Sequence, residues 1–538
     1  MKTKDTSSWS LGLWTIYFAL KVILFWNDTL GFSPLYNFSL LAFVTLPIRW
    51  RLANGLRHFF AVLIAIYLLH YDSYLPPLER LTSQWDLISQ FDTSYLVELL
   101  VDFVSLDFLL LITTLCVGYL YLNQIFRLST FVILAMVLSS IPQGMLKNLS
   151  SPNASFPNAI ATENINNNAQ NDSTTDDVIE TSPQGLNRYL NSFFKEQATV
   201  TSTLSTLDNI EPNFDILFLN ICSLAWDDLE FTGQTQHPLL AEFDILFRQF
   251  NSATSYSGPA VLRILRANCG QQTHSELFEN SLTKKCSLFD NLAELGFEKE
   301  VLMNHDGRFD GFSKHIANNI GPFTPAVDIE TLSPTQYAFD GTKIYQDSSV
   351  LTTWSEQTKS KPTVSLYNTI SIHDGNRVVG EKGTRLVTYK RQQKILLDDL
   401  NSFFKQLKNS ERNIVVIFLP EHGASIRGDR MQISGMREIP TKAITDIPVG
   451  IKFFGNAQVS SSQQVQITAP SSYLALSELL SKVLESGMYQ GNSVDLNELV
   501  KDLPETPFVS QNSGTTMLSI EDRQFYSFDE KSWTEYRQ

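Results

Sequence analysis

Apolar residues are distributed unequally along this chain of 538 residues. Residues 1 to about 146 consist mostly of long apolar runs, whereas the remainder alternates short apolar runs with polar positions. A bilayer core about 30 Å thick needs roughly 20 mostly apolar residues to cross it as a helix. Five segments approach that length, and we predict that they span a membrane: roughly 10–27, 34–50, 57–71, 101–122 and 126–142.

Basic residues are biased toward alternate ends of these predicted spans. One side holds Lys2, Lys4, Arg49, Arg51, Arg57 and Arg127. The loops on the other side, 27–34 and 72–100, hold Arg80 as their one basic residue. Because cytoplasmic loops are enriched in Lys and Arg, the N-terminus is predicted to be cytoplasmic. An odd number of spans then exports everything after about residue 146.

The exported part is predicted to begin with a tether. From about 147 to 212 the sequence is dominated by Asn, Ser, Thr and Asp. Such a run buries too little apolar surface to offset the entropy of ordering, so we expect a flexible segment with a short helix near 186–196. A globular domain is predicted for 213–538.

Short apolar runs and helical patterns alternate within 213–538. Strands are predicted at 214–220, 365–370 and 413–419, and helices at 259–267, 288–295, 388–407 and 472–487. Strands that alternate with helices predict a mostly parallel central sheet covered on both faces. The last stretch, from about 515 to 536, is predicted to form a hairpin or meander.

The overall charge excludes one class of partner. The formal net charge is −15, and no clustered basic run is present. A nucleic-acid surface needs a basic face to neutralise phosphates, so we expect no nucleic-acid partner.

The four cysteines divide between the two parts of the chain. Cys116 lies in the fourth predicted span, where it acts as a small apolar residue. Cys269 and Cys286 enclose sixteen residues of the exported part. That spacing suits a disulfide, which is worth about 3 kcal/mol in the chain-entropy model. Cys222 is then unpaired, and it is either a buried thiol or a ligand.

Two strand ends carry residues that bind metals. Cys222 follows the apolar run FDILFLNI, and Glu421, His422 and Gly423 follow NIVVIFLP. The carboxyl ends of parallel strands are where an open α/β sheet builds its site. Sulfur, oxygen and nitrogen ligands together suit Zn²⁺. A solvated strand end is the alternative for Glu421 and His422.

A turn rich in hydroxyl groups, 252–258, precedes a predicted helix that Pro259 can start. Ser257 would then lie at the helix N-terminus, where the backbone N–H groups attract a phosphoryl group. A metal-bound serine is a candidate nucleophile. The alternative is that Ser255 or Ser257 merely caps the helix.

Two further residues are candidates for phosphoryl chemistry. His373 ends an apolar run and is either an acid/base, a phosphate contact or a loop histidine. Arg437 is a candidate phosphate clamp, or a surface arginine paired with Glu438.

Long segments carry a resemblance to a known family: NICSLAWDD, FNSATSYSGPAVLRILRANCGQ, SIHDGN, PEHGASIRGDRMQISGMREIP and ITDIPVGIKFFG. With them the chain resembles the cellulose phosphoethanolamine transferases of bacterial cellulose-secretion systems, which are membrane-anchored members of the alkaline phosphatase superfamily. The resemblance implies a multi-span membrane domain (1–146), a tether (147–212) and an α/β/α periplasmic catalytic domain (213–538) anchored in the bacterial inner membrane.

The resemblance also implies a chemistry. One Zn²⁺ would be surrounded by Cys222, Ser257, Glu421 and His422, and Ser257 would carry the phosphoethanolamine group. Tyr256, His373 and Arg437 would line the pocket, and Cys269 and Cys286 would form the disulfide. Phosphatidylethanolamine would be the donor and cellulose the acceptor, with subunits of the cellulose synthase complex as partners.

Other functions remain open at this point. The acceptor could be another envelope glycan such as lipid A, although the related lipid A enzymes use Thr as nucleophile and an acidic residue where Cys222 stands. The chain could instead be a structural subunit of the synthase complex. Hydrolysis, by a phosphodiesterase or sulfatase, is a weaker option.

Overall fold

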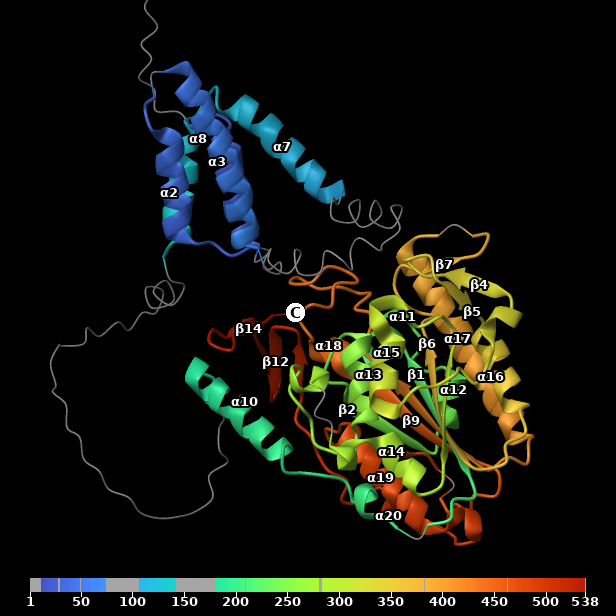
Figure 1. Ribbon diagram of the computed structural model, residues 1–538. Coiled ribbons are helices and arrows are strands. Elements are labelled where there is room, and N and C mark those ends of the chain that lie inside the picture. Colours follow the sequence, from blue (N-terminus) through green and yellow to red (C-terminus); the bar gives the residue numbers. More distant parts are fainter. Residues whose placement is uncertain are drawn as a thin grey trace, which may run out of the picture. The chain divides into compact units, whose positions relative to one another are not determined.

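The computed structural model describes residues 11–27, 30–48, 50–73, 106–141, 180–208, 210–279, 283–381, 383–461 and 463–537. These residues divide into two compact units, one formed by the described residues up to 141 and one by those from 180 onward (Figure 1). The predicted tether up to residue 179 and most of the loop 72–100 lie outside the described residues.

The first unit consists of helices at the positions of the five predicted spans. They are α1 (Trp14–Trp26), α2 (Pro34–Thr45), α3 (Arg51–Tyr71), α7 (Leu106–Leu122) and α8 (Leu128–Ser139). Among the described residues, α3 is the one helix long and apolar enough to cross a membrane. The other four have 12 to 17 residues. Five apolar helices are therefore present, and five complete crossings stay a prediction.

The second unit is built on a seven-stranded sheet. Its strand order is β10 (Val465–Ile467), β2 (Ile245–Asn251), β9 (Asp446–Phe454), β8 (Ile414–Pro420), β1 (Asp215–Ile221), β6 (Thr363–Thr369) and β3 (Glu298–Met303). Neighbouring strands are parallel except at β9, which is antiparallel to both β2 and β8. The sheet is therefore mixed.

The direction of β9 follows from its connection. Parallel neighbours need a crossover, usually a helix, whereas antiparallel neighbours can be joined by a loop. The chain leaves β8 at Pro420 and returns along β9 from Asp446, and the loop between them contains one short helix, α18 (Lys442–Thr445). That loop carries Glu421, His422 and Arg437, so the antiparallel strand holds the site loop against the sheet.

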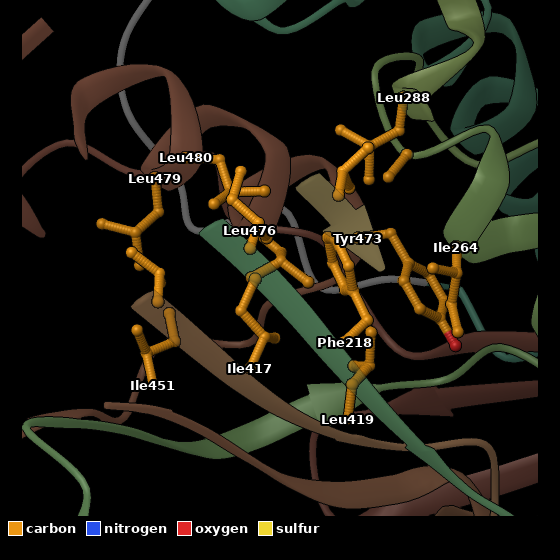
Figure 2. Packing of buried hydrophobic residues seen from close by; sticks show 14 of the residues in the cluster. Phe218, Ile264, Leu288, Ile417, Leu419, Ile451, Tyr473, Leu476, Leu479 and Leu480 are labelled. Carbon is orange, nitrogen blue, oxygen red and sulfur yellow. The ribbon is translucent and has the colours of Figure 1, made fainter. Parts of the chain in front are cut away.

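Helices cover both faces because the central strands β1 and β8 are fully buried and mainly apolar. Ile216 and Phe218 of β1 pack on one face, which is covered by α13 (Ser257–Leu265), α14 (Leu288–Glu294), α15 (Phe312–Ile320), α19 (Tyr473–Ser486) and α20 (Leu496–Leu499). Figure 2 shows Phe218 and Ile417 of this face among side chains of α13, α14 and α19.

The alternate residues Leu217 and Leu219 face the other way. They pack with α11 (Trp226–Thr232), α12 (Pro238–Glu242), α16 (Asp347–Ser355) and α17 (Arg385–Lys408). The period of two along a strand thus produces two cores and an α/β/α layering. The predicted helices and strands of this part all exist in the structure, within a few residues of the expected bounds.

Two smaller sheets complete the unit. One contains β5 (Lys343–Tyr345), β4 (Pro334–Tyr337) and β7 (Arg377–Val378). The other is the predicted C-terminal meander, made of β11 (Val509–Asn512), β12 (Thr515–Ile520), β13 (Arg523–Ser527) and β14 (Thr534–Tyr536).

Helix α10 (Pro183–Gln197) lies beside the meander (Figure 1), within the segment expected to be tether. Its residues Leu186, Leu190 and Phe193 are buried against Val509 and Leu518. The compact unit therefore starts near Glu180 rather than at residue 213, because the apolar stripe of α10 has a sheet face to cover.

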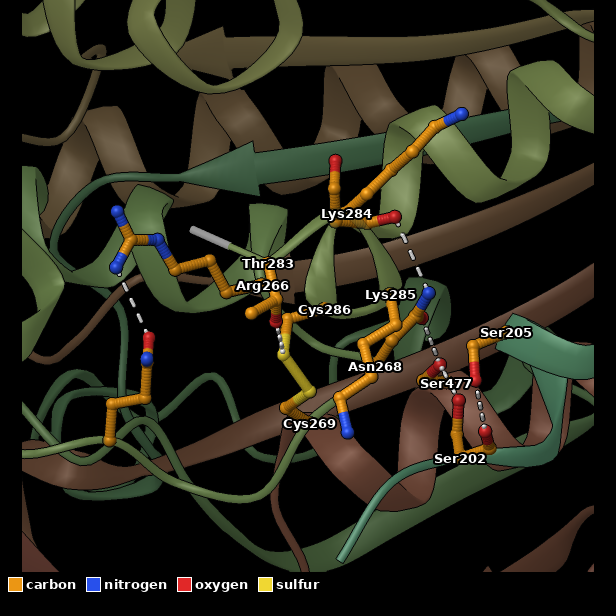
Figure 3. The surroundings of a disulfide bond; sticks show 12 residues. Ser202, Ser205, Arg266, Asn268, Cys269, Thr283, Lys284, Lys285, Cys286 and Ser477 are labelled. Atoms are coloured by element: carbon orange, nitrogen blue, oxygen red, sulfur yellow. Dashed lines mark hydrogen bonds between the residues drawn. A yellow bond between two sulfur atoms is a disulfide. The ribbon is translucent and has the colours of Figure 1, made fainter. Parts of the chain in front are cut away.

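Cys269 and Cys286 form a disulfide, as the spacing predicts, with their Cα atoms 5.0 Å apart (Figure 3). The bond ties the segment after α13 to the turn before α14. Next to it, Asn268 accepts a hydrogen bond from the Ser477 hydroxyl of α19 at 2.6 Å. The C-terminal end of α13 is thereby fixed, which also fixes the direction in which its N-terminus points.

Candidate metal centre and active site

The ends of β1 and β8 bring the predicted metal ligands together. These strands are parallel neighbours with Ile221 opposite Pro420, so Cys222 and Glu421 leave the sheet at the same edge. The Glu421 N–H donates to the Ile221 carbonyl at 2.9 Å. Both side chains and that of His422 are fully buried.

The donor atoms of Cys222, Glu421 and His422 all lie within 4.8 Å of one another. Ser257 completes the group, with its Oγ 3.4 Å from Cys222 Sγ and 3.4 Å from His422 Nε2. The structure thus brings together all four residues that the sequence analysis assigned to a zinc site.

Glu421 shows why this cluster fits a cation. Its Oε1 accepts hydrogen bonds from the side-chain amides of Asn220 and Asn368, each at 2.7 Å. Its Oε2, which is also buried, has no hydrogen-bond partner among the described residues. A buried carboxylate oxygen without a donor costs free energy that a metal ion would recover.

The acid–base properties of the cluster agree with this fit. Burial, followed by the nearby Glu421, raises the pKa of the Cys222 thiol to about 12. Burial also raises the pKa of Glu421, and burial followed by Arg437 lowers that of His422 well below its usual value. Burial therefore acts against the charged form of each group when no cation is present. A divalent cation, which binds thiolate, carboxylate and neutral imidazole, would offset this cost and displace the thiol proton on binding.

His422 is oriented by its own turn. Its Nδ1 lies 2.9 Å from the Gly423 carbonyl and 3.2 Å from Arg437 Nη1. A carbonyl can only accept, so the shorter contact is satisfied when Nδ1 carries the proton. The lone pair of Nε2 then faces Ser257 and the donor cluster, as is usual for a metal-binding histidine.

Gly423 is required for close packing behind the ligands. A Cβ at this position would lie 2.7 Å from the Ala225 Cβ and 2.9 Å from Asp228 Oδ2. Asp228 Oδ2 accepts hydrogen bonds from the N–H groups of Ala225 and Ala424, at 2.9 and 2.8 Å. This one carboxylate therefore links the turn after Cys222 to the turn after His422.

Ser257 is the first residue of α13, two positions earlier than the predicted helix start. The N-cap is Tyr256, which makes no side-chain cap hydrogen bond. Ser255 is engaged elsewhere, because its hydroxyl donates to the Arg437 carbonyl and accepts from the Asn512 amide at 2.7 Å. Neither serine caps the helix, and the Ser257 hydroxyl is left at the donor-rich end of α13.

Arg437 and Tyr256 form one side of the pocket. Arg437 Nη1 donates to the Ser223 hydroxyl at 3.2 Å, and its guanidinium lies 6.0 Å from the centre of the Tyr256 ring. Ser223 has φ +74°, a left-handed conformation that aims its hydroxyl at this contact. Glu438, the alternative partner of Arg437, accepts a hydrogen bond from the Tyr256 hydroxyl at 3.1 Å.

His373 follows β6 and lines the same cavity as Ser257. Its Nδ1 lies 2.7 Å from the Asp374 carbonyl, and its ring centre lies 4.9 Å from that of Phe339. Burial, followed by Arg437, lowers the pKa of His373 to about 4. The imidazole is therefore neutral at pH 7, with Nε2 as its basic atom.

The cavity has a volume of about 200 Å³ and two groups of lining residues. One group consists of Ser257, His422, Arg437 and His373. The other group carries carboxylates and aromatic rings, namely Asp306, Phe309, Asp310, Phe339 and Asp340. The two groups meet where the Phe339 ring packs 4.9 Å from that of His373.

Comparison with known sequences decides which family has these features. The family model named Cellulose biosynthesis protein BcsG C-terminal domain matches residues 168–533, and the corresponding N-terminal domain model matches residues 14–141. The chain belongs to the BcsG family. The Escherichia coli BcsG is 36% identical over 539 residues, covering 98% of this chain and 96% of the relative. The Salmonella typhimurium BcsG is 35% identical, with the same coverage.

Solved structures resemble this BcsG chain more distantly. A protein of the alkaline phosphatase superfamily from Vibrio parahaemolyticus aligns with a TM-score of 0.45 at 15% identity, covering 65% of this chain and 91% of its own. The C-terminal periplasmic domain of EcEptC from Escherichia coli, in complex with Zn, aligns with a TM-score of 0.41 at 14% identity, covering 57% and 90%.

Sequence reasoning missed the residues that support the site of this BcsG chain. Asn220 and Asn368 hold Glu421, Asp228 joins two turns, and Asn512 holds Ser255. For the first two a signal existed, because an amide inside an otherwise apolar strand needs a buried partner. Asn512 carried no such signal, since it comes from the C-terminal meander, more than 250 residues away from Ser255.

Proposed function

We propose that this BcsG-family protein is a zinc-dependent phosphoethanolamine transferase that moves the group from phosphatidylethanolamine to glucosyl 6-hydroxyls of cellulose. The observation that carries the proposal is the position of the Ser257 hydroxyl. It lies 3.4 Å from both Cys222 Sγ and His422 Nε2, at the N-terminus of α13, and it opens into the cavity. A nucleophile so placed suits transfer of an anionic phosphoryl group.

The lining residues of the cavity support this choice of donor. Arg437 and the N-terminus of α13 offer positive charge for a phosphate. The carboxylates and ring faces of the same cavity attract an ammonium group. Among them, Asp310 forms no ion pair among the described residues, and burial raises the pKa of its carboxyl. A phosphate next to Ser257 and an ammonium next to these carboxylates would place one zwitterionic headgroup in the cavity.

Cys222, Glu421, His422 and Ser257 would hold the zinc ion. When bound, zinc supplies Lewis acidity, which stabilises negative charge on phosphoryl oxygens and favours ionisation of the Ser257 hydroxyl. Arg437 would fix the phosphoryl group through its guanidinium, and Tyr256 would position Arg437 from the other side.

In the first half-reaction Ser257 Oγ attacks phosphorus, and the bond from phosphorus to the diacylglycerol oxygen breaks. His373 Nε2 takes the Ser257 proton and returns it to the departing diacylglycerol. In the second half-reaction a glucosyl 6-hydroxyl attacks phosphorus, the bond from phosphorus to Ser257 Oγ breaks, and the hydroxyl proton passes through His373 to Ser257 Oγ. A neutral imidazole can carry out both transfers, which agrees with its lowered pKa.

The location proposed for this chemistry is the periplasmic face of the bacterial inner membrane. Large apolar side chains are exposed mainly in the first unit, for example Leu35, Trp50 and Ile66 at 74%, 73% and 63% exposure. Lipid would cover such a surface. Membership of a cellulose biosynthesis family supports cellulose as the acceptor and the cellulose synthase complex as the partner.

The full-length protein in nanodiscs that contain phosphatidylethanolamine tests the first half-reaction. Intact-mass spectrometry should show one added phosphoethanolamine group on the wild type and none on Ser257→Ala. Ser402→Ala, on the exposed side of α17, is the matched control and should be modified like the wild type. An unchanged adduct on Ser257→Ala would overturn the nucleophile assignment.

The acceptor is tested separately. Strains that express wild type or Ser257→Ala should secrete modified and unmodified cellulose, respectively, as measured by solid-state NMR. Modified lipid A with unmodified cellulose would favour the other acceptor. Modified cellulose from the Ser257→Ala strain would overturn the nucleophile assignment, whereas equally unmodified cellulose from both strains would favour a structural role.

A further inference from the structure

An open groove of about 550 Å³ lies between α10 and the C-terminal meander, apart from the cavity with the nucleophile. Its walls come from three parts of the chain: α10, the loop 273–275 and the strands β11 to β13. The lining is rich in amides, hydroxyl groups and rings, including Asn191, Phe194, His274, Gln511 and Phe528.

The groove contains a polar group without a partner. Thr515 is 1% exposed and lines the groove, and its hydroxyl has no hydrogen-bond partner among the described residues. His274 Nδ1 is buried in the same way. Buried polar atoms of native proteins are almost always bonded, so these two atoms indicate a missing donor or acceptor at this wall.

The charges of the groove select against anionic ligands. Asp529 and Glu530 line it, whereas none of the described lining residues is Lys or Arg. Both carboxylates are already engaged: Asp529 Oδ1 accepts from the N–H of Ser532 at 2.8 Å, and Glu530 Oε1 accepts from the Thr516 hydroxyl at 3.0 Å. A lipid phosphate would be repelled, while a neutral polyol can bond to the amides and hydroxyls and pack on the rings.

A line of rings leads from this groove to the nucleophile. The centre of the His274 ring lies 5.2 Å from that of Phe278, which lies 5.5 Å from that of His315. Phe278 is 44% exposed, and His315 lines the cavity that contains Ser257. A Cβ placed on Gly258, the residue after the nucleophile, would lie 3.8 Å from the His315 ring.

The groove is also connected to the turn that carries Ser257 through a residue of β11. Asn512 lines it and donates hydrogen bonds to the Ser255 hydroxyl at 2.7 Å and to the Arg437 carbonyl at 3.1 Å. The same strand end thus forms part of the groove and fixes the residues next to Ser257 and within the phosphate clamp.

We propose that this groove binds the acceptor, a neutral β-linked glucan, and that Phe278 and His315 guide it to Ser257. The assignment rests on the proposed function for the identity of the acceptor. The groove would hold the sugar units that precede the modified one, so that the polymer is bound along its length while a single 6-hydroxyl enters the cavity.

Binding is tested on the full-length protein in detergent, without donor, by a ligand-observed NMR titration with cellohexaose. Wild type should bind cellohexaose and bind the α-linked maltohexaose at least about fivefold more weakly. Asn191→Ala combined with Phe278→Ala removes one amide and one exposed ring and should weaken cellohexaose binding roughly tenfold. Ser192→Ala combined with Phe231→Ala is the matched control, on the same helix and on an exposed ring outside the groove, and should bind like the wild type.

Folding is controlled in two ways. The variants should keep the wild-type unfolding temperature and acquire the Ser257 adduct at the wild-type rate, because neither substitution touches the donor cavity. Thr515→Val, which keeps the side-chain shape and removes only the unpartnered hydroxyl, should weaken binding about threefold without lowering stability.

Equal affinity of wild type and the Asn191→Ala, Phe278→Ala variant would overturn the assignment, as would absence of cellohexaose binding to the wild type. The outcome is independent of the proposed chemistry. If Ser257 forms no adduct but groove variants lose cellohexaose, the groove stands and the transferase proposal fails. If the Ser257 adduct forms and the groove variants bind cellohexaose like the wild type, the transferase proposal stands and the groove assignment fails.

Discussion

Two buried clusters of charged and polar groups, one taken from each unit of this protein, differ in one respect. The cluster of the first unit is closed, since the hydrogen-bonding capacity of its charged groups is used. The cluster of the second unit is open, since one oxygen of its carboxylate has no donor among the described residues.

The closed cluster joins the ends of three helices of the first unit. The Lys21 ammonium donates to Asn37 Oδ1 at 2.8 Å, to the Leu68 carbonyl at 3.2 Å and to the Asp72 carboxylate. The Asn37 amide donates to the same carboxylate at 2.8 Å, and the Ser33 N–H donates to its other oxygen at 3.1 Å. Every ammonium proton therefore has an acceptor, and the cluster has no capacity left for a ligand.

The open cluster is equally buried, and it too contains a carboxylate that accepts hydrogen bonds from side-chain amides. Glu421 Oε1 is held by two asparagines, as Asp72 is held by Asn37 and Lys21. Glu421 Oε2, in contrast, makes no hydrogen bond within 3.5 Å among the described residues and lies 3.9 Å from His422 Nε2 in the metal-binding group. The difference indicates that burial of charge alone does not mark a site. A buried charged group holds helices together when all its hydrogen-bonding atoms have partners. It can bind a ligand when one acceptor atom is left without a partner.

Glu421→Gln gives the largest effect and tests the open cluster directly. The amide cannot supply the negative charge that zinc requires, so zinc content should fall from about one per chain to nearly none, and transfer should fall more than about a thousandfold. The metal-free protein should be no less stable than metal-free wild type, because the substitution removes a buried carboxyl without a partner. Metal analysis and thermal unfolding measure the two properties.

Glu300→Gln is the matched control for that experiment. Glu300 lies on β3, and its carboxylate is closed: Oε2 accepts from the Trp354 indole at 2.9 Å and from the Ser365 hydroxyl at 3.0 Å, while Oε1 accepts from Lys359. This variant should lose stability and keep its zinc. If Glu421→Gln retained zinc, or lost more stability than Glu300→Gln, the distinction between open and closed clusters would be wrong.

The sequence predicted these regions unequally, for physical reasons. Strands β1 and β8 are mainly apolar runs between polar turns, and β6 alternates apolar with polar residues, so the local pattern is sufficient to locate them. Strand β9 was not predicted. Its antiparallel direction depends on the long loop that carries the site, and no local sequence pattern determines the direction of a strand. Helix α10 was placed within the predicted tether because the residue against which its apolar stripe packs, Leu518, lies more than 300 residues later in the sequence.

The site was predictable where chemistry is local. Cys222, Ser257, Glu421 and His422 were identified because each follows a strand or opens a helix, and the fold then brings them within reach. The supporting residues Asn220, Asn368 and Asn512 were not, because their role is a contact with one particular partner. The closed cluster of the first unit escaped for the same reason, since Lys21 and Asp72 meet only when the helices pack.

Lys21→Met tests the closed cluster and should have the second largest effect. It leaves the Asp72 carboxylate buried without its cation, which costs about 3–5 kcal/mol when a buried pair is broken. Adding Asp72→Asn should restore most of that loss, because it removes the unpaired buried charge and its one amide oxygen can still accept from the Ser33 N–H. Unfolding in detergent measures both variants. Zinc content should not change in either, and a loss of zinc with Lys21→Met would contradict the separation of the two clusters.

Asn220→Ala should have the smallest effect and shows how far the open cluster depends on its supports. The Asn220 amide donates one 2.7 Å hydrogen bond to Glu421 Oε1, and its own Oδ1 has no partner among the described residues. Truncation therefore removes one hydrogen bond from Glu421 and leaves no other group without its partner. Loss of a group that orients a metal ligand typically lowers metal affinity about 10–100-fold. Asn368 still donates to the same oxygen, so zinc affinity should fall by the smaller factor, about tenfold. A competition titration with a zinc chelator measures the change. Without metal, Asn220→Ala should lower the unfolding temperature by only about 2–4 °C, the effect of one lost hydrogen bond. A much larger decrease would show that Asn220 acts on the fold of β1 rather than on the ligand.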